Sequence, residues 1–416
     1  MVRSLVGLTL VIALALAGCG ARTGLGVDDA AISVDAEPPE PCISSPETCN
    51  GLDDDCDGVV DDELLGCGAR LSAGFGQTCA LRGAGTVVCW GGGSAFGGEG
   101  GTPHEIAGIT DATDVSAGRS RTCVARRSGA AACFGSGYFG ELGDGTMRAM
   151  RSTPLPVTGL SDAVEVATDD GLFHSCARRR SGELACWGIN DHGQLGDGTS
   201  DNRLVPTAVS GITDAAELAL GFLQTCARRR TGEIACWGSI GPDPFGGGTA
   251  LDRLVPTLVA GIDDAVELSA GTAYTCARRR SGAVFCWGVN GSGQLGDGTT
   301  SDRYSPAPVS GLTDAVELSA GGAHTCARRA AGSVVCWGEN DYGQLGDGTL
   351  GRRLTPTPVT GLRGVVEIAA GTYHTCARLS TDEILCWGGD GSGAVTDPGR
   401  GGALVPFLTP TLVAGL

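Results

Sequence analysis

The chain has 416 residues, and its 47 acidic residues outnumber its 29 basic ones to give a net charge of −18. Every basic residue is arginine, and an acidic balance of this size argues against a general nucleic-acid binder, so no nucleic-acid partner is expected. The 71 glycines and the 5% aromatic content favour an all-β protein, and the 19 cysteines indicate an oxidising compartment.

Residues 1–19 have the features of an export signal in their usual order. A basic residue precedes an apolar run, Leu5–Ala17, that is too short to span a membrane as a helix. The run overlaps Leu16-Ala17-Gly18-Cys19, which resembles the bacterial lipobox, and this resemblance implies that Cys19 is lipidated. The alternative is an ordinary cleaved signal peptide with a chance cysteine. Gly20 is not the Asp that retains lipoproteins at the inner membrane, so we expect a lipid anchor at the outer membrane or cell surface.

Two short segments follow the signal. Residues 20–41 are polar and acidic and end in a proline-rich stretch, which is typical of a flexible tether. Residues 42–67 form a small module rich in cysteine and aspartate. Its four cysteines allow three disulfide connectivities, and the sequence does not choose among Cys42, Cys49, Cys56 and Cys67.

The same module carries carboxylates at the spacing of a calcium loop. Three alternating aspartates precede Gly58, which permits a sharp turn, but Leu64 stands where an EF-hand has its bidentate Glu. The segment also resembles a short Cys-Asn-Gly-x-Asp-Asp-Asp-Cys-Asp-Gly motif of bacterial surface proteins, and this resemblance implies metal binding. Hard carboxylates suit Ca²⁺ better than zinc, and the alternative is an acidic linker without metal. The expected calcium ligands are Asp53, Asp55, Asp57, Asp61 and Asp62.

A unit of about fifty residues recurs seven times between residues 68 and 416, which predicts a solenoid or a propeller. Each unit contains two cysteines separated by nine residues, and each pair is predicted to form a structural disulfide. A redox-active or metal-binding thiol array is the alternative. The predicted pairs are Cys79 with Cys89, Cys123 with Cys133, Cys176 with Cys186, Cys226 with Cys236, Cys276 with Cys286, Cys326 with Cys336 and Cys376 with Cys386.

The midpoint of each cysteine pair predicts a hairpin turn. In the unit Tyr274–Gly298, Arg280-Ser281-Gly282 fits a three-residue loop whose last residue is left-handed, a conformation that Gly adopts without steric cost. Five other units have Gly in this slot, and the seventh has Asp382. Strand formers flank the turn at Ala265–Gly271 and Val284–Trp287.

Seven Pro-x-x-Val-x-Gly-Leu-like pieces also occur, and we take each to precede a hairpin. On that assignment the first hairpin, Ala69–Trp90, lacks its piece, whereas the last piece, Pro410–Leu416, has no hairpin after it. A ring in which the C-terminal strand completes the first blade would explain both ends and leave no exposed sheet edge. We therefore predict a seven-bladed β-propeller with strand-exchange closure.

The repeats resemble those of the regulator of chromosome condensation family. The resemblance rests on His324-Thr325-Cys326-Ala327, Val335–Asn340 and Gly343-Gln344-Leu345-Gly346-Asp347-Gly348, and it covers roughly residues 69–416. It implies a seven-bladed propeller. It implies little about function, because the family ranges from nucleotide exchange on a small GTPase to enzyme inhibition and scaffolding.

One candidate site lies two residues before the first cysteine of each pair. Three of these seven positions are histidines, which could share a metal ion. We favour the alternative, in which each side chain forms hydrogen bonds within its own blade. The residues are Gln77, Arg121, His174, Gln224, Tyr274, His324 and His374.

A second candidate is a crown of arginines beside the hairpin turns. Guanidinium groups suit carboxylates and phosphates, so this crown could bind an acidic protein or an anionic glycan. In the alternative, neighbouring acidic side chains neutralise it. The candidate ligand face consists of Arg178, Arg179, Arg180, Arg228, Arg229, Arg230, Arg278, Arg279 and Arg280.

Blades that depart from the repeat are the third candidate. Phe134 replaces a tryptophan in the second blade, and the loops Gly91–Gly101, Ser239–Gly248 and Gly389–Gly402 lose the Gln-Leu-Gly core. We find no catalytic constellation, so we expect a monomeric, non-catalytic binding propeller in the bacterial cell envelope, with an extracellular protein or anionic glycan as ligand. The alternatives are an inhibitor of a secreted enzyme and an enzyme that uses the irregular loops.

Overall fold

The computed structural model describes residues 70–92, 102–169, 171, 174–239, 252–389, 393–395 and 406–416. The chain divides into two units, Met1–Cys42 and Ile43–Leu416, and every described residue belongs to the second. Cys19, the tether and the aspartate-rich module therefore lie outside the described residues.

All the described elements are β-strands, and they form seven sheets of four strands each. Blade 1 contains β1 (Leu71–Ala73), β2 (Gln77–Leu81), β3 (Val87–Gly91) and β4 (His104–Glu105). Blade 2 contains β5 (Ala112–Ala117), β6 (Arg121–Arg126), β7 (Ala131–Gly137) and β8 (Arg148–Pro156). Blade 3 contains β9 (Ala163–Thr168), β10 (His174–Arg179), β11 (Leu184–Gly188) and β12 (Arg203–Ala208).

The remaining blades follow the same pattern. Blade 4 contains β13 (Ala215–Leu220), β14 (Gln224–Arg229), β15 (Ile234–Gly238) and β16 (Arg253–Leu258). Blade 5 contains β17 (Ala265–Ala270), β18 (Tyr274–Arg279), β19 (Val284–Gly288) and β20 (Arg303–Pro308). Blade 6 contains β21 (Ala315–Ala320), β22 (His324–Arg329), β23 (Val334–Gly338) and β24 (Arg353–Pro358). Blade 7 contains β25 (Val365–Ala370), β26 (His374–Leu379), β27 (Ile384–Gly388) and β28 (Phe407–Leu412).

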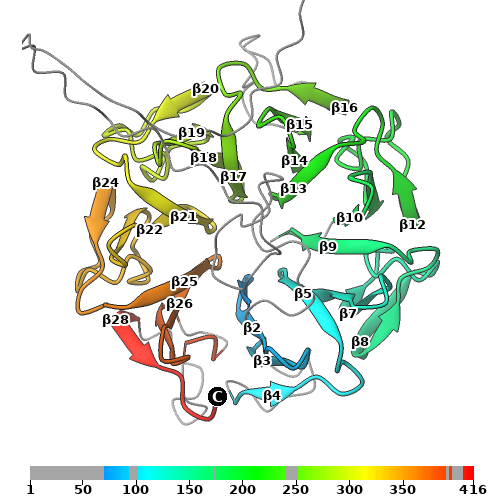
Figure 1. Ribbon diagram of the computed structural model, residues 1–416, viewed down its shortest axis with the longest axis horizontal. Helices are drawn as coiled ribbons and strands as arrows, with labels where there is room; N and C mark the ends of the chain where they lie inside the picture. Colours follow the sequence, from blue (N-terminus) through cyan, green and yellow to red (C-terminus); the bar gives the residue numbers. More distant parts are fainter. Residues whose placement is uncertain are drawn as a thin grey trace, which may run out of the picture. The chain divides into compact units, whose positions relative to one another are not determined.

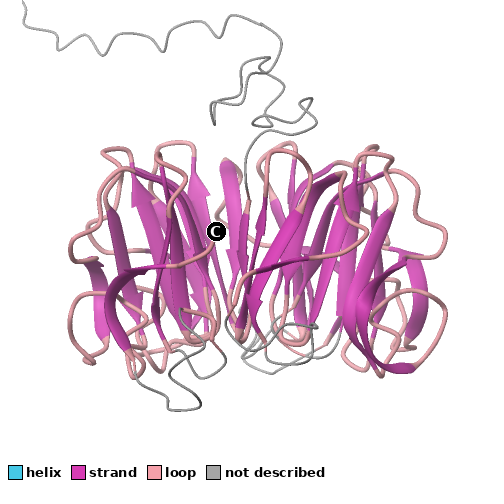
Figure 2. Ribbon diagram, turned by 90° about the horizontal axis from the view of Figure 1, so that it is seen from below, coloured by secondary structure: helices cyan, strands magenta, loops and turns pink. Residues whose placement is uncertain are grey.

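The seven sheets stand around a central channel, which confirms the predicted seven-bladed β-propeller (Figures 1 and 2). The first strand of each blade lies innermost, and the fourth lies on the outer rim. The innermost strands surround a channel of about 280 Å³. Within each blade, the first-to-second and third-to-fourth connections open on one side of the ring. The hairpin turns between the second and third strands lie on the other side.

The hairpins form as predicted. Cys276 and Cys286 are direct cross-strand partners, and their Cα atoms are 4.1 Å apart across a disulfide. The turn glycine Gly282 has φ +82°, and Asp382 has φ 66°. The same disulfide forms in the other six blades, between Cys79 and Cys89, Cys123 and Cys133, Cys176 and Cys186, Cys226 and Cys236, Cys326 and Cys336, and Cys376 and Cys386.

These bonds give the fourteen cysteines of the propeller the structural role that their spacing predicts. Each disulfide joins the two middle strands of one blade, and no bond joins neighbouring blades among these pairs. All fourteen cysteines are buried and disulfide-bonded, which contradicts the alternative of a redox-active or metal-binding thiol array.

The predicted strand exchange is wrong, because every blade is continuous in sequence. β28 pairs with β27 of its own blade, and the short β4 completes blade 1. Each proline-containing piece is the end of a fourth strand and pairs back onto the third strand that precedes it. The Val-x-Gly-Leu part is the link to the next blade, and it starts with the N–H of Val259, which donates to the carbonyl of Ile234 (2.8 Å).

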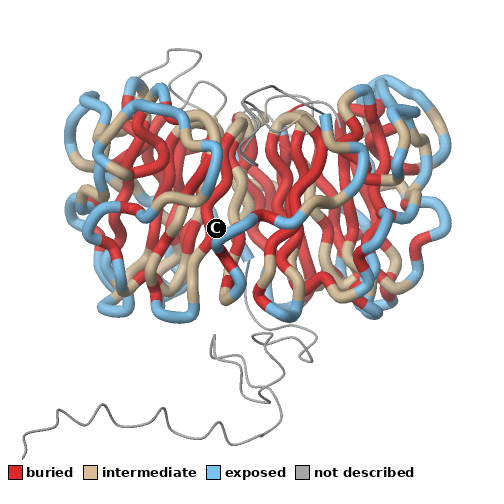
Figure 3. The backbone as a smooth tube through the Cα atoms, turned by 90° about the horizontal axis from the view of Figure 1, so that it is seen from above, coloured by how far each residue is buried: buried red, intermediate tan, exposed pale blue. Residues whose placement is uncertain are grey.

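The hydrophobic core lies between blades. One cluster joins Leu184 and Leu195 of blade 3 to Leu218 and Trp237 of blade 4. Burial is greatest in the second and third strands of each blade, whereas the fourth strands and the outer turns are half-buried or exposed (Figure 3). At the seam, Leu71 and Trp90 of blade 1 pack with residues of blade 7, so side-chain packing closes the ring without strand exchange.

Candidate functional site

The side chain two positions before the first cysteine connects neighbouring blades. His174, His324 and His374 hydrogen-bond through Nε2 to a threonine hydroxyl of the next blade, at 2.7 to 2.8 Å. The expectation that these residues bond within their own blade is therefore wrong, because the side chain at this position points into the blade interface. Burial lowers the pKa of His324 to about 3 and that of His374 to about 4, so both imidazoles stay neutral.

Glutamine and tyrosine at this position also form hydrogen bonds to the next blade. The Nε2 of Gln77 donates to Thr122 Oγ1 (3.1 Å), and that of Gln224 donates to Thr275 Oγ1 (3.3 Å). Tyr274 donates its hydroxyl to the carbonyl of His324. The varied residue types share one structural role, which is to join neighbouring blades. No cluster of metal-ligating side chains occurs among the described residues.

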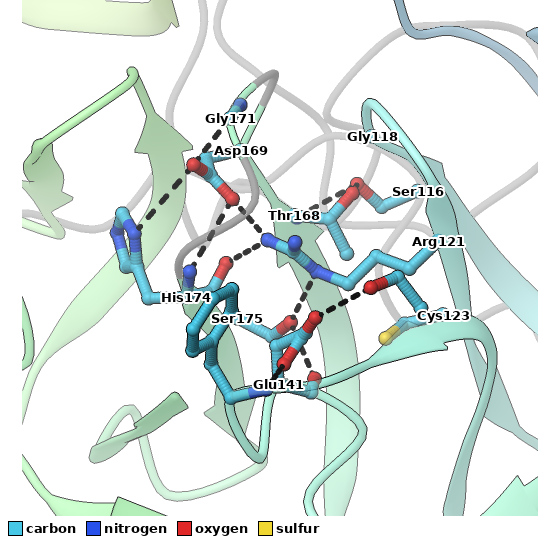
Figure 4. Close-up of polar contacts among 12 residues, drawn as sticks. Ser116, Gly118, Arg121, Cys123, Glu141, Thr168, Asp169, Gly171, His174 and Ser175 are labelled. Carbon is cyan, nitrogen blue, oxygen red and sulfur yellow. Dashed lines mark hydrogen bonds and ion pairs between the residues drawn. The ribbon is translucent and has the colours of Figure 1, made fainter. Parts of the chain in front are cut away.

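The interface between blades 2 and 3 contains the most polar version of this contact (Figure 4). Arg121 is fully buried, donates from Nε to Ser175 Oγ (3.0 Å) and forms an ion pair with Asp169. Asp169 also accepts from the backbone N–H of Gly171 (3.0 Å). The first connection of blade 3 is two residues longer than that of blade 5, and Asp169 comes directly after β9, where blade 5 has Gly271.

Asp169, His174 and Thr225 lie in the order of an acid, a base and a hydroxyl. Asp169 Oδ2 is 4.0 Å from His174 Nδ1, and His174 Nε2 is 2.8 Å from Thr225 Oγ1. All three side chains are buried, and Thr225 Oγ1 donates to the carbonyl of Gln194 (2.8 Å). Burial lowers the pKa of His174 to about 4. Two other interfaces have the same His–Thr contact without an aspartate, so we assign this trio a structural role.

A nearby carboxylate, Glu141, is also buried (Figure 4). It replaces the glutamine of the Gly-Gln-Leu-Gly turns and accepts from Ser136 Oγ (2.9 Å) and the N–H of Phe139 (2.6 Å). Its backbone carbonyl accepts from Trp187 Nε1 (2.9 Å) of the next blade. Both oxygens are used to hold the turn, which docks on the neighbouring blade.

A ring of carboxylates, called the channel carboxylates below, lies on the innermost strands. Glu217 accepts from Arg228 Nε of its own blade (2.9 Å) and from the backbone N–H of Leu268 in the next blade (3.0 Å). The same pair of contacts recurs at Glu165, Glu267, Glu317 and Glu367. Desolvation raises the pKa of Glu217 and Glu317 to about 7. These acids join blades and neutralise arginines at the same time.

Blade 1 reverses the charge at this position. Arg70 occupies the slot of the glutamate, and it forms an ion pair with Asp114 of blade 2. Blade 2 has Ala125 where blades 3 to 7 have the partner arginine, so Asp114 depends on blade 1 for its cation. Asp114 still accepts from the N–H of Val166 in blade 3 (2.8 Å), and the bridging ring therefore continues.

The arginine crown is neutralised in two of its three layers. The first arginine of each triplet pairs with a channel glutamate, as Arg278 does with Glu267 (2.6 Å). The second pairs with an aspartate of the interblade link, as Arg229 does with Asp214 (2.9 Å). The third is exposed and has no ion pair with a described residue; this layer consists of Arg180, Arg230, Arg280 and the equivalent Arg127.

The irregular loops predicted as contact surfaces lie almost entirely outside the described residues. A departure that was not predicted from the repeat pattern lies within the described part, at the β7–β8 connection of blade 2 and the start of β8. Tyr138, Phe139, Met147 and Met150 are exposed there. The chain has only 3 methionines, so two within four positions were a signal in the sequence. Among the described residues, no helix has the length and hydropathy needed to cross a membrane.

Comparisons with known proteins agree with this architecture. Two family profiles described as "Regulator of chromosome condensation (RCC1) repeat" match the chain, one at residues 181–227, 281–328 and 331–378. The other matches residues 164–194, 265–294, 315–344 and 365–394. The human E3 ubiquitin-protein ligase HERC2 is 31% identical over 155 residues, which are 35% of this chain but only 3% of that ligase.

Solved structures show the same fold at low sequence identity. Yeast RCC1 (Prp20), in complex with Kap60, has a TM-score of 0.68 and 19% identity, over 79% of this chain and 83% of that one. Human WBSCR16 has a TM-score of 0.66 and 21% identity, over 75% and 87% of the two chains. A second structure of Prp20p from Saccharomyces cerevisiae has a TM-score of 0.68 and 20% identity, over 79% and 85%.

Proposed function

This chain carries regulator of chromosome condensation (RCC1) repeats, and from that premise we propose that it is a non-catalytic binding propeller of the bacterial cell envelope. It holds an extracellular protein partner, acts as a monomer and is attached to the membrane through a lipid on Cys19. The similar yeast propeller Prp20 supports protein binding: one of its structures is described in complex with Kap60, and another with its binding properties to Gsp1p and histones.

One observation carries the proposal. The polar side chains that recur in the repeat are used to join one blade to the next, as at His324, Glu217 and the Glu141 turn. Seven disulfides staple the hairpins between these contacts. The repeat therefore builds a rigid frame, and recognition falls to exposed residues that break the repeat.

The test is affinity capture from intact envelopes with the disulfide-bonded, full-length protein as bait. We expect one protein at near-stoichiometric yield that is not chemically altered by the bait. If the captured protein is an enzyme that loses activity at equimolar bait, the inhibitor alternative holds. Turnover of a captured molecule would overturn the non-catalytic role, and capture of nothing would overturn the scaffold.

An anionic glycan is the second candidate ligand. The exposed guanidinium groups of Arg180, Arg230 and Arg280 favour it, because they lie on consecutive hairpin turns without ion pairs to described residues. Reversal of all three to Glu should abolish binding to anionic polysaccharide. Reversal of Arg119 and Arg352, on the other side of the ring, is the control. Equal binding by the triple variant would exclude this ligand face.

The anchor and the calcium module complete the proposal, and both lie outside the described residues. Cys19→Ala should release the protein from membranes, and an unchanged membrane fraction would contradict the anchor. Calorimetric titration of the full chain should show calcium binding that is lost when Asp53 and Asp55 are changed to Asn. Absence of binding at millimolar calcium would exclude the metal site.

A further inference from the structure

The outermost strand of blade 2 differs from the fourth strands of the other blades. β8 has 9 residues, whereas β12, β16, β20, β24 and β28 have 6. Those five strands all have proline at their fourth position, where it removes a backbone donor from the free edge. Pro154 of β8 lies in the register of those prolines, because Leu155 pairs with Cys133 as Thr257 pairs with Cys236. The residues by which β8 is longer lie before it, so Arg148–Thr153 is a longer proline-free edge with no described strand paired to it (Figure 1).

Apolar side chains lie beside this edge. Tyr138 is 55% exposed, Phe139 43%, Met147 66% and Met150 42%. The last pair of the β7–β8 ladder is Gly137 with Arg148, so Tyr138 and Met147 come directly after it on the two strands. Exposed aromatic and methionine side chains in one group are typical of a binding surface. β16 also exposes several apolar side chains, Leu254, Val255 and Leu258, but all three are aliphatic.

The edge also carries two positive charges that form no ion pair with any residue in the described part of the chain. In blades 3, 5 and 6, the first arginine of the fourth strand pairs with the aspartate of the Gly-Asp-Gly turn at 2.6 to 2.7 Å. In blade 2 one extra residue separates the turn from Arg151, the register counterpart of Arg203. Asp144 accepts from the N–H and hydroxyl of Thr146, as its counterparts do from their threonines, but it pairs with no arginine among the described residues. Arg148 and Arg151 consequently form no ion pair with a described residue.

We propose that β8 binds an extended, acidic peptide segment of a partner protein as an added strand. The free backbone groups of Arg148–Thr153 pair with the peptide, and Arg148 and Arg151 bind its carboxylates. Met147, Met150 and Tyr138 pack against its apolar side chains. A second copy of this chain is a poor occupant, because pairing β8 with β8 would bring four arginines together.

This inference rests on the proposed function and names the class of partner. The test uses the full-length protein and a displayed library of ten-residue peptides in which Glu alternates with a random residue. We expect enrichment of binders whose affinity falls at least tenfold with the Arg148→Glu/Arg151→Glu protein. Met147→Glu/Met150→Glu should weaken the same peptides, and Leu254→Glu/Val255→Glu on β16 is the matched control.

Amide hydrogen exchange distinguishes strand addition from loose charge attraction. Bound peptide should slow exchange at Arg148–Thr153, while the fourth strand of blade 4 stays unchanged. No enriched peptide, or equal binding to the Arg148→Glu/Arg151→Glu protein, would overturn the inference. A concentration-dependent dimer that this variant abolishes would also overturn it in favour of a second copy. If envelope capture still yields a partner with this variant, the scaffold stands and only the β8 site fails.

Discussion

At the scale of single residues, one position shows how different side chains can do the same work. His324 and Gln77 both reach a threonine hydroxyl of the next blade, at 2.8 and 3.1 Å. The imidazole differs in one respect, because it can take up a proton and become a buried charge. The amide cannot, so the chain contains a natural substitution that keeps the hydrogen bond and removes the titration.

We predict that His324→Gln/His374→Gln makes the propeller more resistant to acid. The unfolded chain protonates these imidazoles near pH 6.5, whereas the folded pKa values are about 3 and about 4, so stability falls as the pH drops below 6.5. At pH 5 each of these histidines lowers the free energy of unfolding by about 2 kcal/mol relative to its value above pH 6.5. The Tm difference between pH 7.5 and pH 5 should shrink in the variant. An identical Tm drop in both proteins would contradict the prediction.

At the scale of the element, the hairpin turn was readable from the sequence and the fourth strand was not. Cysteine spacing and a recurrent glycine fix the turn locally, since both constraints lie within eleven residues. The piece around Pro256 lies between two hairpins, and either could accept it. An outer-edge strand contacts only one neighbour, so its own sequence pattern does not show to which hairpin it belongs.

The turn glycines should differ in their tolerance of a side chain. A Cβ at Gly282 would lie 2.7 Å from the carbonyl oxygen of Thr313, whereas one at Gly332 meets nothing closer than 3.9 Å. Both residues have positive φ, of 82° and 73°. We expect Gly332→Ala to cost about 1 kcal/mol from backbone strain alone, and Gly282→Ala to cost clearly more. Urea unfolding of both variants measures these losses in the free energy of unfolding. Equal losses would refute the effect of the Cβ contact at Gly282.

At the scale of the whole molecule, the interfaces between blades hold the ring together. Three bridging layers recur: the channel carboxylates, serines such as Ser269, and the histidine or glutamine position. The sequence contained every member of these layers at regular spacing. The sequence could not show that the hydrogen-bond partners of these side chains lie about fifty residues away in the next blade. A residue that recurs in each repeat has equivalent possible partners in every blade.

The seam between blades 1 and 2 should be the most sensitive to loss of one charge. Asp114 is only 3% exposed, and its cation is Arg70. Arg70→Ala leaves this carboxylate with its Val166 contact alone. We expect the free energy of unfolding to fall by about 1–3 kcal/mol, which is less than for a fully buried pair because the arginine itself is half-exposed. Urea unfolding measures it, with Arg352→Ala as control. A loss no larger than that of the control would contradict the role of the pair.

The charge reversal at Arg70 also restricts which repeats can be duplicated in the gene. Most repeats encode an acid for the following interface and a backbone donor for the preceding one, so an in-frame duplication of blade 5 or 6 supplies a complete unit. Blade 1 is different, because its tandem copy would set one Arg70 against another in place of Asp114. Recombination is therefore expected to change the copy number among the middle repeats and to preserve a single first one.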